Sequence, residues 1–451
     1  MLKRLIPAIL LGLFLAVMSE PQVQAELSQT LTQMLSPSRA VSSGDLAGFV
    51  TVRGTTLVTP DGKELRLRGM SLGNWLLPEG YMFGFEKAVA ARQIREVTAE
   101  LLGPDDSARF WRDFEDGYIT RDDIRFIARC GFNSVRVPFH FGLFQTDDSP
   151  PLMRERGFEL LDRVIAWCRD ERLWVILDLH AAPGGQTGEN IDDGWGYPWL
   201  FESPESQQRC IYLWRRIATR YRDEKTVLGY ELLNEPIPHF PEYRHLLPLL
   251  EPLYKKITAA IREVDPYHLI ILGGAKWNSD FSVFGQPFDS KLVYAFHKYW
   301  TAPDVSVIKD YLTFRDRWQV PIWCGESGEN TLDWIRTFHR TLEENRVGWC
   351  FWPYKKMKPE TCCVSIRPPA GWNAVIRYAD GLRGGTYEEK RKARPPRDRC
   401  RKIFAELSRN IRFSRGILNG KFNEALGMDV PVLSENGRTP ISPAPNQGGK
   451  K

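Results

Sequence analysis

Apolar runs of strand length alternate with longer amphipathic segments along most of the chain. The runs cover residues 68–75, 133–139, 174–181, 227–236, 268–277, 292–300, 320–328 and 348–354. Several of them, such as VILDL and LIILGG, are almost continuously apolar, as parallel strands buried on both faces are. The segments between them, 158–172 and 206–221 among them, place apolar residues three and four positions apart, which is typical of helices.

Eight strands separated by helices predict an α/β fold. The first strand is not followed by the glycine-rich turn of a dinucleotide-binding fold. We therefore expect a closed (β/α)8 TIM barrel rather than an open, doubly wound sheet. Residues 49–58, a Pro-Asp-Gly turn at 60–62 and residues 65–67 predict an N-terminal β-hairpin that closes one end of the barrel.

The first 25 residues have the composition of a secretory signal peptide. Lys3 and Arg4 precede an apolar run at 5–17, and Val-Gln-Ala at 23–25 provides the small residues of a cleavage site. We expect cleavage near Ala25 and a secreted or periplasmic protein. Because the run is shorter than the roughly 20 residues of a spanning helix, a retained signal anchor is the alternative. No later segment is apolar enough to predict a membrane span.

The remaining chain divides into three parts by composition. Residues 26–45 are small and polar and predict a linker, while residues 46–415 hold the barrel and end in a predicted closing helix at 398–413. Residues 416–451 are rich in polar residues, Pro and Gly, and predict a disordered tail.

The charge balance argues against a nucleic-acid-binding protein. The chain carries 61 Lys and Arg against 56 Asp and Glu, a formal net charge of +5 over 451 residues. Much of the excess lies in the basic run at 390–401, which we interpret as a solvated surface, with a site for an anionic partner as the alternative. The 15 Trp, 15 Tyr and 24 Phe residues suit a core, and also a cleft in which sugar rings stack on aromatic side chains.

Eight cysteines in an exported chain permit disulfides without requiring them. Cys130, Cys168, Cys324 and Cys350 lie in apolar runs and predict buried thiols. The adjacent pair at 362–363 is the place where a bridge is expected if one forms, with Cys400 as a candidate partner.

Polar and ionisable residues recur where the predicted strands end, which is where a barrel enzyme carries its chemistry. Each of them alone could be a structural residue, a buried ion-pair partner or a hydrogen-bonded core histidine. Six strand ends share the pattern, and this agreement favours a catalytic barrel. The residues are Arg136, His180, Asn234, Glu235, His297, Tyr299, Glu326 and Trp352.

Two of these residues are carboxylates on opposite sides of the expected barrel mouth. Paired carboxyl groups can cleave a glycosidic bond, because one protonates the leaving oxygen while the other attacks the anomeric carbon or activates water. Arg136 and Tyr299 are candidates for keeping Glu326 ionised. Glu235 is then the group that must be protonated, and a nearby ionised carboxylate in a partly dry cleft would raise its pKa.

The histidine and cysteine spacing does not predict a metal site. The seven histidines include no His-x-His or His-Glu-x-x-His arrangement, and no cysteine pair has zinc-ribbon spacing. We therefore expect neither a metal nor another cofactor. His180 and His297 are interpreted as residues that position substrate or tune the acid.

The segments SVRVPF, LDLHAAPGGQ, LLNEP, FHKYW, CGESG and FWPY resemble, in this order, the motifs of glycoside hydrolase family 5, the cellulase-like clan A glycosidases. The segment RLRGMSLGNWL resembles the first strand of the family's β-glucanase-like members and makes Asn74 a candidate substrate contact. The resemblance covers about residues 46–415. It implies a retaining mechanism with Glu235 as acid/base and Glu326 as nucleophile. It also implies supporting roles for Arg136, His180, Asn234, His297, Tyr299 and Trp352.

The loop HAAPGGQTGENIDDGWG is similar to that of the exo-glucanase-like branch of the family. It makes Asp192, Asp193 and Trp195 candidate sugar contacts, with a plain loop role as the alternative. Trp277 and Asn278, after the fifth strand, are candidates for the far side of the cleft.

The resemblance favours a β-glucan polysaccharide or oligosaccharide, or a related β-glucoside, as substrate. A glucan-remodelling transglycosylase, a mannan-specific hydrolase and a non-catalytic carbohydrate-binding barrel remain alternatives.

Overall fold

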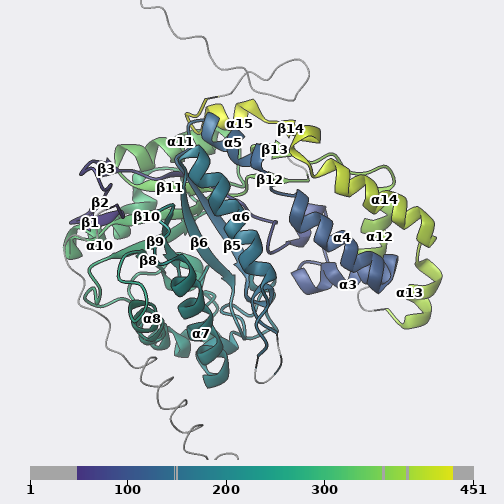
Figure 1. Ribbon diagram of the computed structural model, residues 1–451, viewed down its shortest axis with the longest axis horizontal. Coiled ribbons are helices and arrows are strands. Elements are labelled where there is room, and N and C mark those ends of the chain that lie inside the picture. Colours follow the sequence, from purple (N-terminus) through teal and green to yellow (C-terminus); the bar gives the residue numbers. More distant parts are fainter. Residues whose placement is uncertain (1–47, 147, 149–150, 358–360, 382–384, 430–451) are drawn as a thin grey trace, which may run out of the picture. The chain divides into compact units, whose positions relative to one another are not determined.

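The centre of the protein is a closed barrel of eight parallel strands (Figure 1). The computed structural model describes residues 48–146, 148, 151–357, 361–381 and 385–429. The strands, in chain order around the ring, are β4 (Arg68–Ser71), β5 (Ser134–His140), β6 (Trp174–Ala181), β7 (Val227–Glu231), β8 (Leu269–Gly273), β9 (Leu292–Lys298), β10 (Ile322–Ser327) and β11 (Gly348–Phe351). The predicted (β/α)8 barrel is confirmed.

Several predicted strands end earlier than their apolar pattern suggested, and two of them lead into site residues. β7 stops at Glu231 rather than at 236, and β8 stops at Gly273 rather than at 277. The residues that follow turn sharply, because Glu235, Trp277 and Asn278 have φ angles of 46°, 56° and 57°. A residue whose backbone is in the left-handed region turns the chain away from the direction of the strand. These turns give the site residues their positions beyond the strand ends.

Helices follow the barrel strands along the chain, and three of these helices lie between β4 and β5. The helices are α3 (Ala91–Leu102), α4 (Pro104–Gly117), α5 (Arg121–Arg129), α6 (Arg156–Glu171), α7 (Pro204–Tyr221), α8 (Leu247–Arg262), α9 (Ala275–Asn278), α10 (Lys309–Trp318), α11 (Leu332–Glu344), α12 (Trp372–Gly381), α13 (Tyr387–Ala393), α14 (Arg397–Asn410) and α15 (Gly420–Ala425). The start of α7 shows how local sequence determines where a helix begins. Pro204 opens its first turn, and the Ser203 side chain accepts a hydrogen bond from the Ser206 backbone N–H.

The N-terminal hairpin forms, but the run at 49–58, predicted as one arm of it, folds into two strands that pair with each other. β1 (Thr51–Arg53), β2 (Thr56–Val58) and β3 (Glu64–Leu65) pair in antiparallel order. Leu57 and Leu67 belong to one apolar cluster with Ile176, Leu269 and Val293 of the barrel strands. The hairpin therefore covers the amino-terminal end of the barrel, opposite the end at which the polar residues gather.

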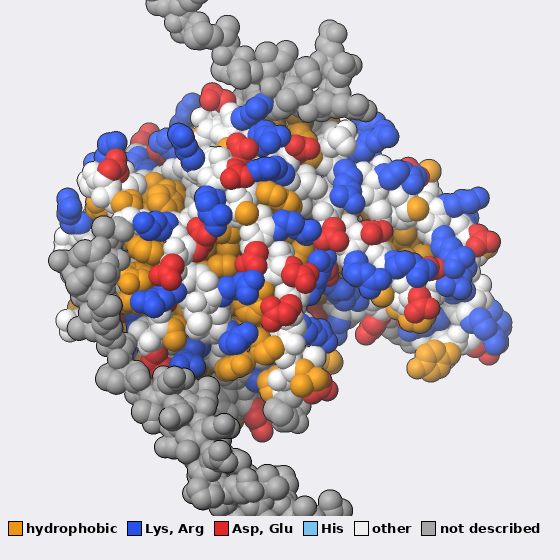
Figure 2. Space-filling model, in the orientation of Figure 1, with side chains coloured by type: hydrophobic (Ala, Val, Ile, Leu, Met, Phe, Trp, Pro, Cys, Tyr) orange, Lys and Arg blue, Asp and Glu red, His pale blue; other side chains and the backbone are white. Residues whose placement is uncertain are grey.

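The closing helix predicted at 398–413 forms as α14, and it packs beside α3 and α4, a contact that the sequence did not predict (Figure 1). Lys and Arg side chains are frequent on the surface over α13 and α14 (Figure 2). Part of the basic run at 390–401 is more than a solvated surface. Arg394 donates to the Glu100 and Leu101 carbonyls, and Arg397 donates to the Leu102 carbonyl. Positive charge at the carboxyl end of α3 is favourable, because unpaired carbonyls carry partial negative charge there.

The ordered fold extends past the predicted end of the barrel domain. β14 (Ile417–Leu418) pairs with β13 (Val364–Ser365), which pairs with β12 (Lys355–Lys356). Phe422 and Leu426, in and after α15, are fully buried. The prediction of a disordered tail from 416 is therefore wrong for 416–429, because these apolar residues cover the barrel wall. The predicted signal peptide at 1–25, the linker at 26–45 and the last part of the predicted tail lie outside the described residues.

All eight cysteines lie in the described part of the chain, where each is buried and none forms a disulfide. The bridge expected at Cys362 or Cys363 does not form, and Cys400 is unpaired as well. Within the described residues, no helix is both long and apolar enough to cross a membrane.

Candidate active site

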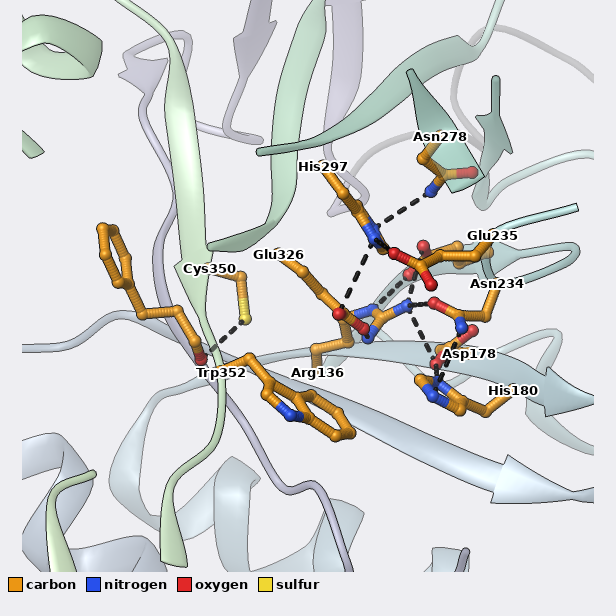
Figure 3. A network of polar contacts seen from close by, with 12 residues as sticks. Arg136, Asp178, His180, Asn234, Glu235, Asn278, His297, Glu326, Cys350 and Trp352 are labelled. Atoms are coloured by element: carbon orange, nitrogen blue, oxygen red, sulfur yellow. Dashed lines mark hydrogen bonds and ion pairs between the residues drawn. The ribbon is translucent and has the colours of Figure 1, made fainter. Parts of the chain in front are cut away.

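A buried guanidinium lies at the centre of the polar network at the barrel mouth (Figure 3). Arg136, on β5, is fully buried and binds Glu231 through Nε at 2.6 Å and through Nη2 at 3.0 Å. Its Nη2 also lies 3.0 Å from Asp178 Oδ2 and 2.8 Å from Asn234 Oδ1. Its Nη1 donates to Glu326. One side chain thus connects four strand ends, since the planar fork of arginine offers several donors in fixed directions.

Glu326, on β10, receives hydrogen bonds on both carboxylate oxygens. Oε1 accepts from Arg136, and Oε2 accepts from the Tyr299 hydroxyl at 3.0 Å. Burial raises the pKa of Tyr299 well above its ordinary value, so the phenol keeps its proton and acts as a donor. Both predicted partners of Glu326 are thus in contact with it, one on each carboxylate oxygen.

Glu235 faces Glu326 from the turn after β7. Its Oε1 lies 2.8 Å from Nδ1 of His297, and one oxygen of each carboxylate and the histidine nitrogen all lie within 4.8 Å of one another. Burial raises the pKa of Glu235 to about 8, and the positive charge of Arg136 opposes this rise. The sequence predicted the direction of the shift and the contribution of a dry cleft, whereas the neighbouring carboxylate is not among its causes.

Two neutral histidines flank the pair. Burial lowers the pKa of His180 to about 3 and that of His297 to about 4. Nδ1 of His180 lies 2.7 Å from Asp178, and its Nε2 lies 3.2 Å from Nδ2 of Asn234. A neutral ring fits these contacts if Nδ1–H donates to the carboxylate and Nε2 accepts from the carboxamide. The same assignment lets the Nδ1–H of His297 donate to Glu235.

Trp352 closes one wall of the site. Its ring stacks on His180 with the centroids 5.3 Å apart and the planes 6° from parallel, and it is only 5% exposed. Gly73 lies against the ring edge, where an added Cβ would come within 2.5 Å of Trp352 Cη2. The indole Nε1–H donates to the Tyr81 hydroxyl at 2.8 Å. The indole is therefore held by contacts to one face, to its edge and to its ring nitrogen.

Of the remaining candidates, Asn278 and Trp277 lie near the site and Asn74 does not face it. Asn278 is fully buried, with Nδ2 3.0 Å from Nε2 of His297. Trp277 packs edge-on against Phe240. Asn74 is 1% exposed and is used within the fold, because its Oδ1 accepts from the Glu79 backbone N–H and its Nδ2 donates to Tyr118. The expectation that Asn74 contacts substrate is therefore not supported.

The three candidates in the loop after β6 have mainly structural contacts. Asp192 is buried and accepts from the backbone N–H groups of Thr187 and Gly188. Asp193 accepts from the Arg92 backbone N–H at 2.9 Å. Trp195 is 71% exposed and lies under the Arg92 guanidinium at 4.0 Å. For Asp192 the plain loop role holds, while Trp195 presents an open aromatic face.

Several site residues were missed in the sequence. Asp178 and Glu231 hold Arg136 from inside β6 and β7, and their signal was a lone acid within an apolar run. Glu79 is 5% exposed, and burial together with the charges of Glu326 and Glu235 raises its pKa well above the ordinary value. Gln186 donates to the carbonyls of His180 and Asn234 and so ties two turns together.

The spacing of Glu235, His297 and Glu326 would also suit a metal ion. The donor set argues for another use, because Arg136 and Tyr299 already occupy both oxygens of Glu326 and His297 is bound on both ring nitrogens. A cation would have to compete with the Arg136 charge beside it. The arrangement instead suits acid–base and nucleophilic chemistry by two carboxyl groups.

Known proteins with similar sequences are glycosidases. The chain is 36% identical over 254 residues to a beta-xylosidase of Phanerodontia chrysosporium, an alignment that covers 56% of this chain and 52% of that protein. It is 26% identical over 311 residues to endoglucanase C of Acetivibrio thermocellus, covering 55% and 87%. The chain thus spans about half the length of the first of these relatives and most of the second.

Solved structures show the same fold at low identity. An endogalactoceramidase matches with a TM-score of 0.52 and 19% identity over 68% of this chain and 75% of that one. A rutinosidase from Aspergillus niger matches with a TM-score of 0.51 and 17% identity over 65% and 90%.

A family description covers the barrel and its site. The model for "Cellulase (glycosyl hydrolase family 5)" matches residues 98–358, which include Arg136, Glu235 and Glu326. With more than half of its 451 residues matched, the chain belongs to glycosyl hydrolase family 5, a family of O-glycosyl hydrolases.

Proposed function

We propose that this protein is a retaining β-glycosidase that cleaves β-glucosidic bonds in a β-glucan or a related β-glucoside. One observation carries the proposal: the carboxyl groups of Glu235 and Glu326 approach within 4.8 Å across the barrel mouth. Retaining enzymes hold their two carboxyl groups about 5 to 5.5 Å apart, whereas inverting enzymes leave roughly 6.5 to 9.5 Å for a water molecule. The spacing favours direct attack by a carboxylate.

In the first step, an ionised Glu326 oxygen bonds to the anomeric carbon while the bond from that carbon to the leaving oxygen breaks. Glu235 gives its proton to the leaving oxygen, which departs as a neutral alcohol. The raised pKa of Glu235 supports this role, since the carboxyl group holds its proton near neutral pH. The hydrogen bonds from Arg136 and Tyr299 hold the two oxygens of Glu326 in place for the attack.

In the second step, Glu235 is ionised and removes a proton from a water molecule that attacks the anomeric carbon. The bond to Glu326 breaks, and the sugar leaves with the configuration it had in the substrate. Asn234 accepts from Arg136 through Oδ1 and uses one amide hydrogen on His180, so its second amide hydrogen is the group we expect to bond a sugar hydroxyl next to the reacting carbon. Trp352 supplies an apolar wall for the same ring.

A row of aromatic side chains on the side of Glu235 suits a saccharide or aryl leaving group. Ring contacts run from Trp199 through Tyr197, Tyr243 and Phe240 to Trp277, with centroids between 4.7 and 6.3 Å apart. These residues follow β6, β7 and β8, and β7 leads to Glu235. Because the acid protonates the leaving oxygen, the leaving group lies on the side of Glu235. Sugar rings and aryl groups both present apolar faces that stack on aromatic rings.

The names of the relatives guide the choice of test substrates. Besides the beta-xylosidase and the endoglucanase, proteins of Aspergillus clavatus and Emericella nidulans that match at 29% and 30% identity are called probable glucan 1,3-beta-glucosidase A. A panel should therefore contain aryl β-glucosides and β-xylosides, β-1,3-, β-1,4- and mixed-linkage glucans, and mannan.

Incubating the protein with this panel tests the proposal. We expect release of sugar from a β-glucoside or β-glucan, with the β-anomer appearing first when the reaction is followed by proton NMR. First release of the α-anomer would contradict the retaining mechanism. Elongated products at high substrate concentration would indicate a transglycosylase, cleavage of mannan alone would indicate a mannan-specific hydrolase, and tight binding without release would indicate a non-catalytic barrel.

The pH dependence of kcat/KM provides a separate prediction. The active form carries a proton on Glu235, and burial keeps that proton bound until the pH rises to about 8. Activity should therefore decline as the pH rises through about 8, by about tenfold per pH unit at higher pH. The Glu235→Gln variant, assayed with an aryl glycoside whose leaving group needs no proton, should lose this alkaline decline. A decline that persists in the variant would assign it to another group.

A further inference from the structure

Two consecutive lysines, Lys355 and Lys356, are fully buried just after Trp352 in the chain. A buried ammonium group is unfavourable unless it is paired and hydrogen-bonded. Each lysine has its own carboxylate, because Lys355 pairs with Asp123 and Lys356 pairs with Glu329. The two lysines are alike in burial, but Asp123 is fully buried whereas the Glu329 side chain is 17% exposed, and the two pairs face different parts of the molecule.

The Lys356 pair is connected to the site by a chain of hydrogen bonds. The Glu329 carboxylate accepts from Lys356 and, at 3.2 Å, from the Tyr81 hydroxyl. The Tyr81 oxygen in turn accepts from the Trp352 indole N–H at 2.8 Å. The Glu329 carbonyl also accepts from the indole N–H of the exposed Trp300 at 3.0 Å.

The Lys355 pair is anchored in the fold. The Lys355 ammonium donates to the carbonyls of Tyr118 at 2.7 Å and Ile411 at 3.1 Å, and Asp123 accepts from the Tyr354 hydroxyl at 3.0 Å. None of these contacts reaches Trp352 or either of the two facing carboxyl groups. The chain therefore contains a matched pair of buried lysines, of which only one is linked to the sugar site.

We propose that Lys356 and Glu329 form a positioning pair that fixes Tyr81 and, through it, the indole of Trp352 against the reacting sugar. Two structural features of the pair support this role. Glu329 sits three residues after Glu326 in a left-handed turn with φ of 47°, which directs its carboxylate away from the path of the strand. Thr361 Oγ1 accepts a further hydrogen bond from Lys356 at 3.2 Å and limits its movement. The inference rests on the proposed function, since it takes Trp352 as a wall of the sugar site.

The Tyr81→Phe variant tests the link without disturbing the buried charges. Tyr81 is 40% exposed, so loss of its hydroxyl leaves the core intact. We expect kcat/KM for an aryl β-glucoside to fall by about 10- to 100-fold, mainly through kcat, because the reacting sugar is less well oriented. The unfolding temperature should stay close to that of the native protein.

The Lys356→Met and Lys355→Met variants provide the matched comparison. Both leave one carboxylate without its cation, the fully buried Asp123 or the partly buried Glu329, so both should lower the unfolding temperature. Below that temperature, Lys356→Met should lose activity as Tyr81→Phe does, whereas Lys355→Met should keep kcat/KM within about twofold. The double variant Lys356→Met/Glu329→Gln should regain about tenfold over Lys356→Met, because the amide oxygen can still accept from Tyr81 without a lone charge.

A crystal structure of Tyr81→Phe gives a readout that does not depend on activity. An indole of Trp352 displaced from its stack on His180 supports the positioning pair, and an unchanged indole overturns it. Equal losses of activity in the two lysine variants, in proportion to their losses of stability, would also overturn it. If the native protein cleaves none of the panel substrates, the proposed function fails while the structural readout still decides this inference.

Discussion

The Glu326→Ala variant is expected to lose at least about four orders of magnitude in kcat on β-glucosides, about 5.5 kcal/mol of transition-state stabilisation. The reason is that Glu326 is the group placed to form the covalent bond, with Arg136 and Tyr299 holding its two oxygens. Removing the carboxylate leaves a space beside the anomeric carbon and keeps Glu235 as the acid.

Azide should restore part of this activity. The small anion can enter the space, bond to the anomeric carbon through nitrogen and displace the leaving group from an activated aryl β-glucoside. The product should be a glycosyl azide of inverted configuration, identified by NMR. The exposed Glu263, which pairs with Arg215 at 3.2 Å, offers a matched control, and Glu263→Ala should keep native turnover and show no response to azide. Near-native turnover by Glu326→Ala would exclude it as the nucleophile.

The Arg136→Met variant is expected to lose both stability and activity. Asp178 and Glu231 are fully buried and would be left near Glu326 without the shared cation. Removing one partner from a buried ion pair costs about 3 to 5 kcal/mol, because the remaining charge is not compensated. We expect a loss of this size in the free energy of unfolding measured in urea, and a loss of more than about 10³-fold in kcat/KM.

Two further substitutions of arginine residues serve as comparisons, one that keeps the charge at 136 and one at an exposed ion pair. Arg136→Lys keeps the charge but not the planar fork that binds Glu231 through two nitrogens, so it should recover stability only in part. Arg220→Met breaks an exposed pair with Asp162 and should cost no more than about 1 kcal/mol. If Arg136→Met lost no more unfolding free energy than Arg220→Met, the buried network would not stabilise the fold.

The barrel could be predicted from the sequence because its signals are local. Each strand is a short apolar run and each helix has its own period, so the order of elements gives the topology without knowledge of distant contacts. Site residues such as Arg136, Glu235 and Glu326 could be found for the same reason. Each lies at or just after a strand, and parallel strands around a barrel bring these ends to one face.

The parts that could not be predicted depend on contacts between distant segments. Nothing near residue 91 indicates that α3 will meet the basic run at 390–401, and nothing near residue 417 indicates pairing with β13. The role of Asn74 was misjudged for a related reason. A strand-end asparagine suits a sugar contact, and only the folded chain shows that the Glu79 backbone and Tyr118 already occupy its carboxamide.

The close approach of Gly73 to Trp352 limits how this sequence can change over evolutionary time. Even a methyl group at position 73 would meet the indole at 2.5 Å, while the stack on His180 holds one face of the ring. A side chain larger than glycine at 73 is therefore tolerated only together with a smaller ring at 352. Two positions near opposite ends of the barrel domain thus share one evolutionary constraint.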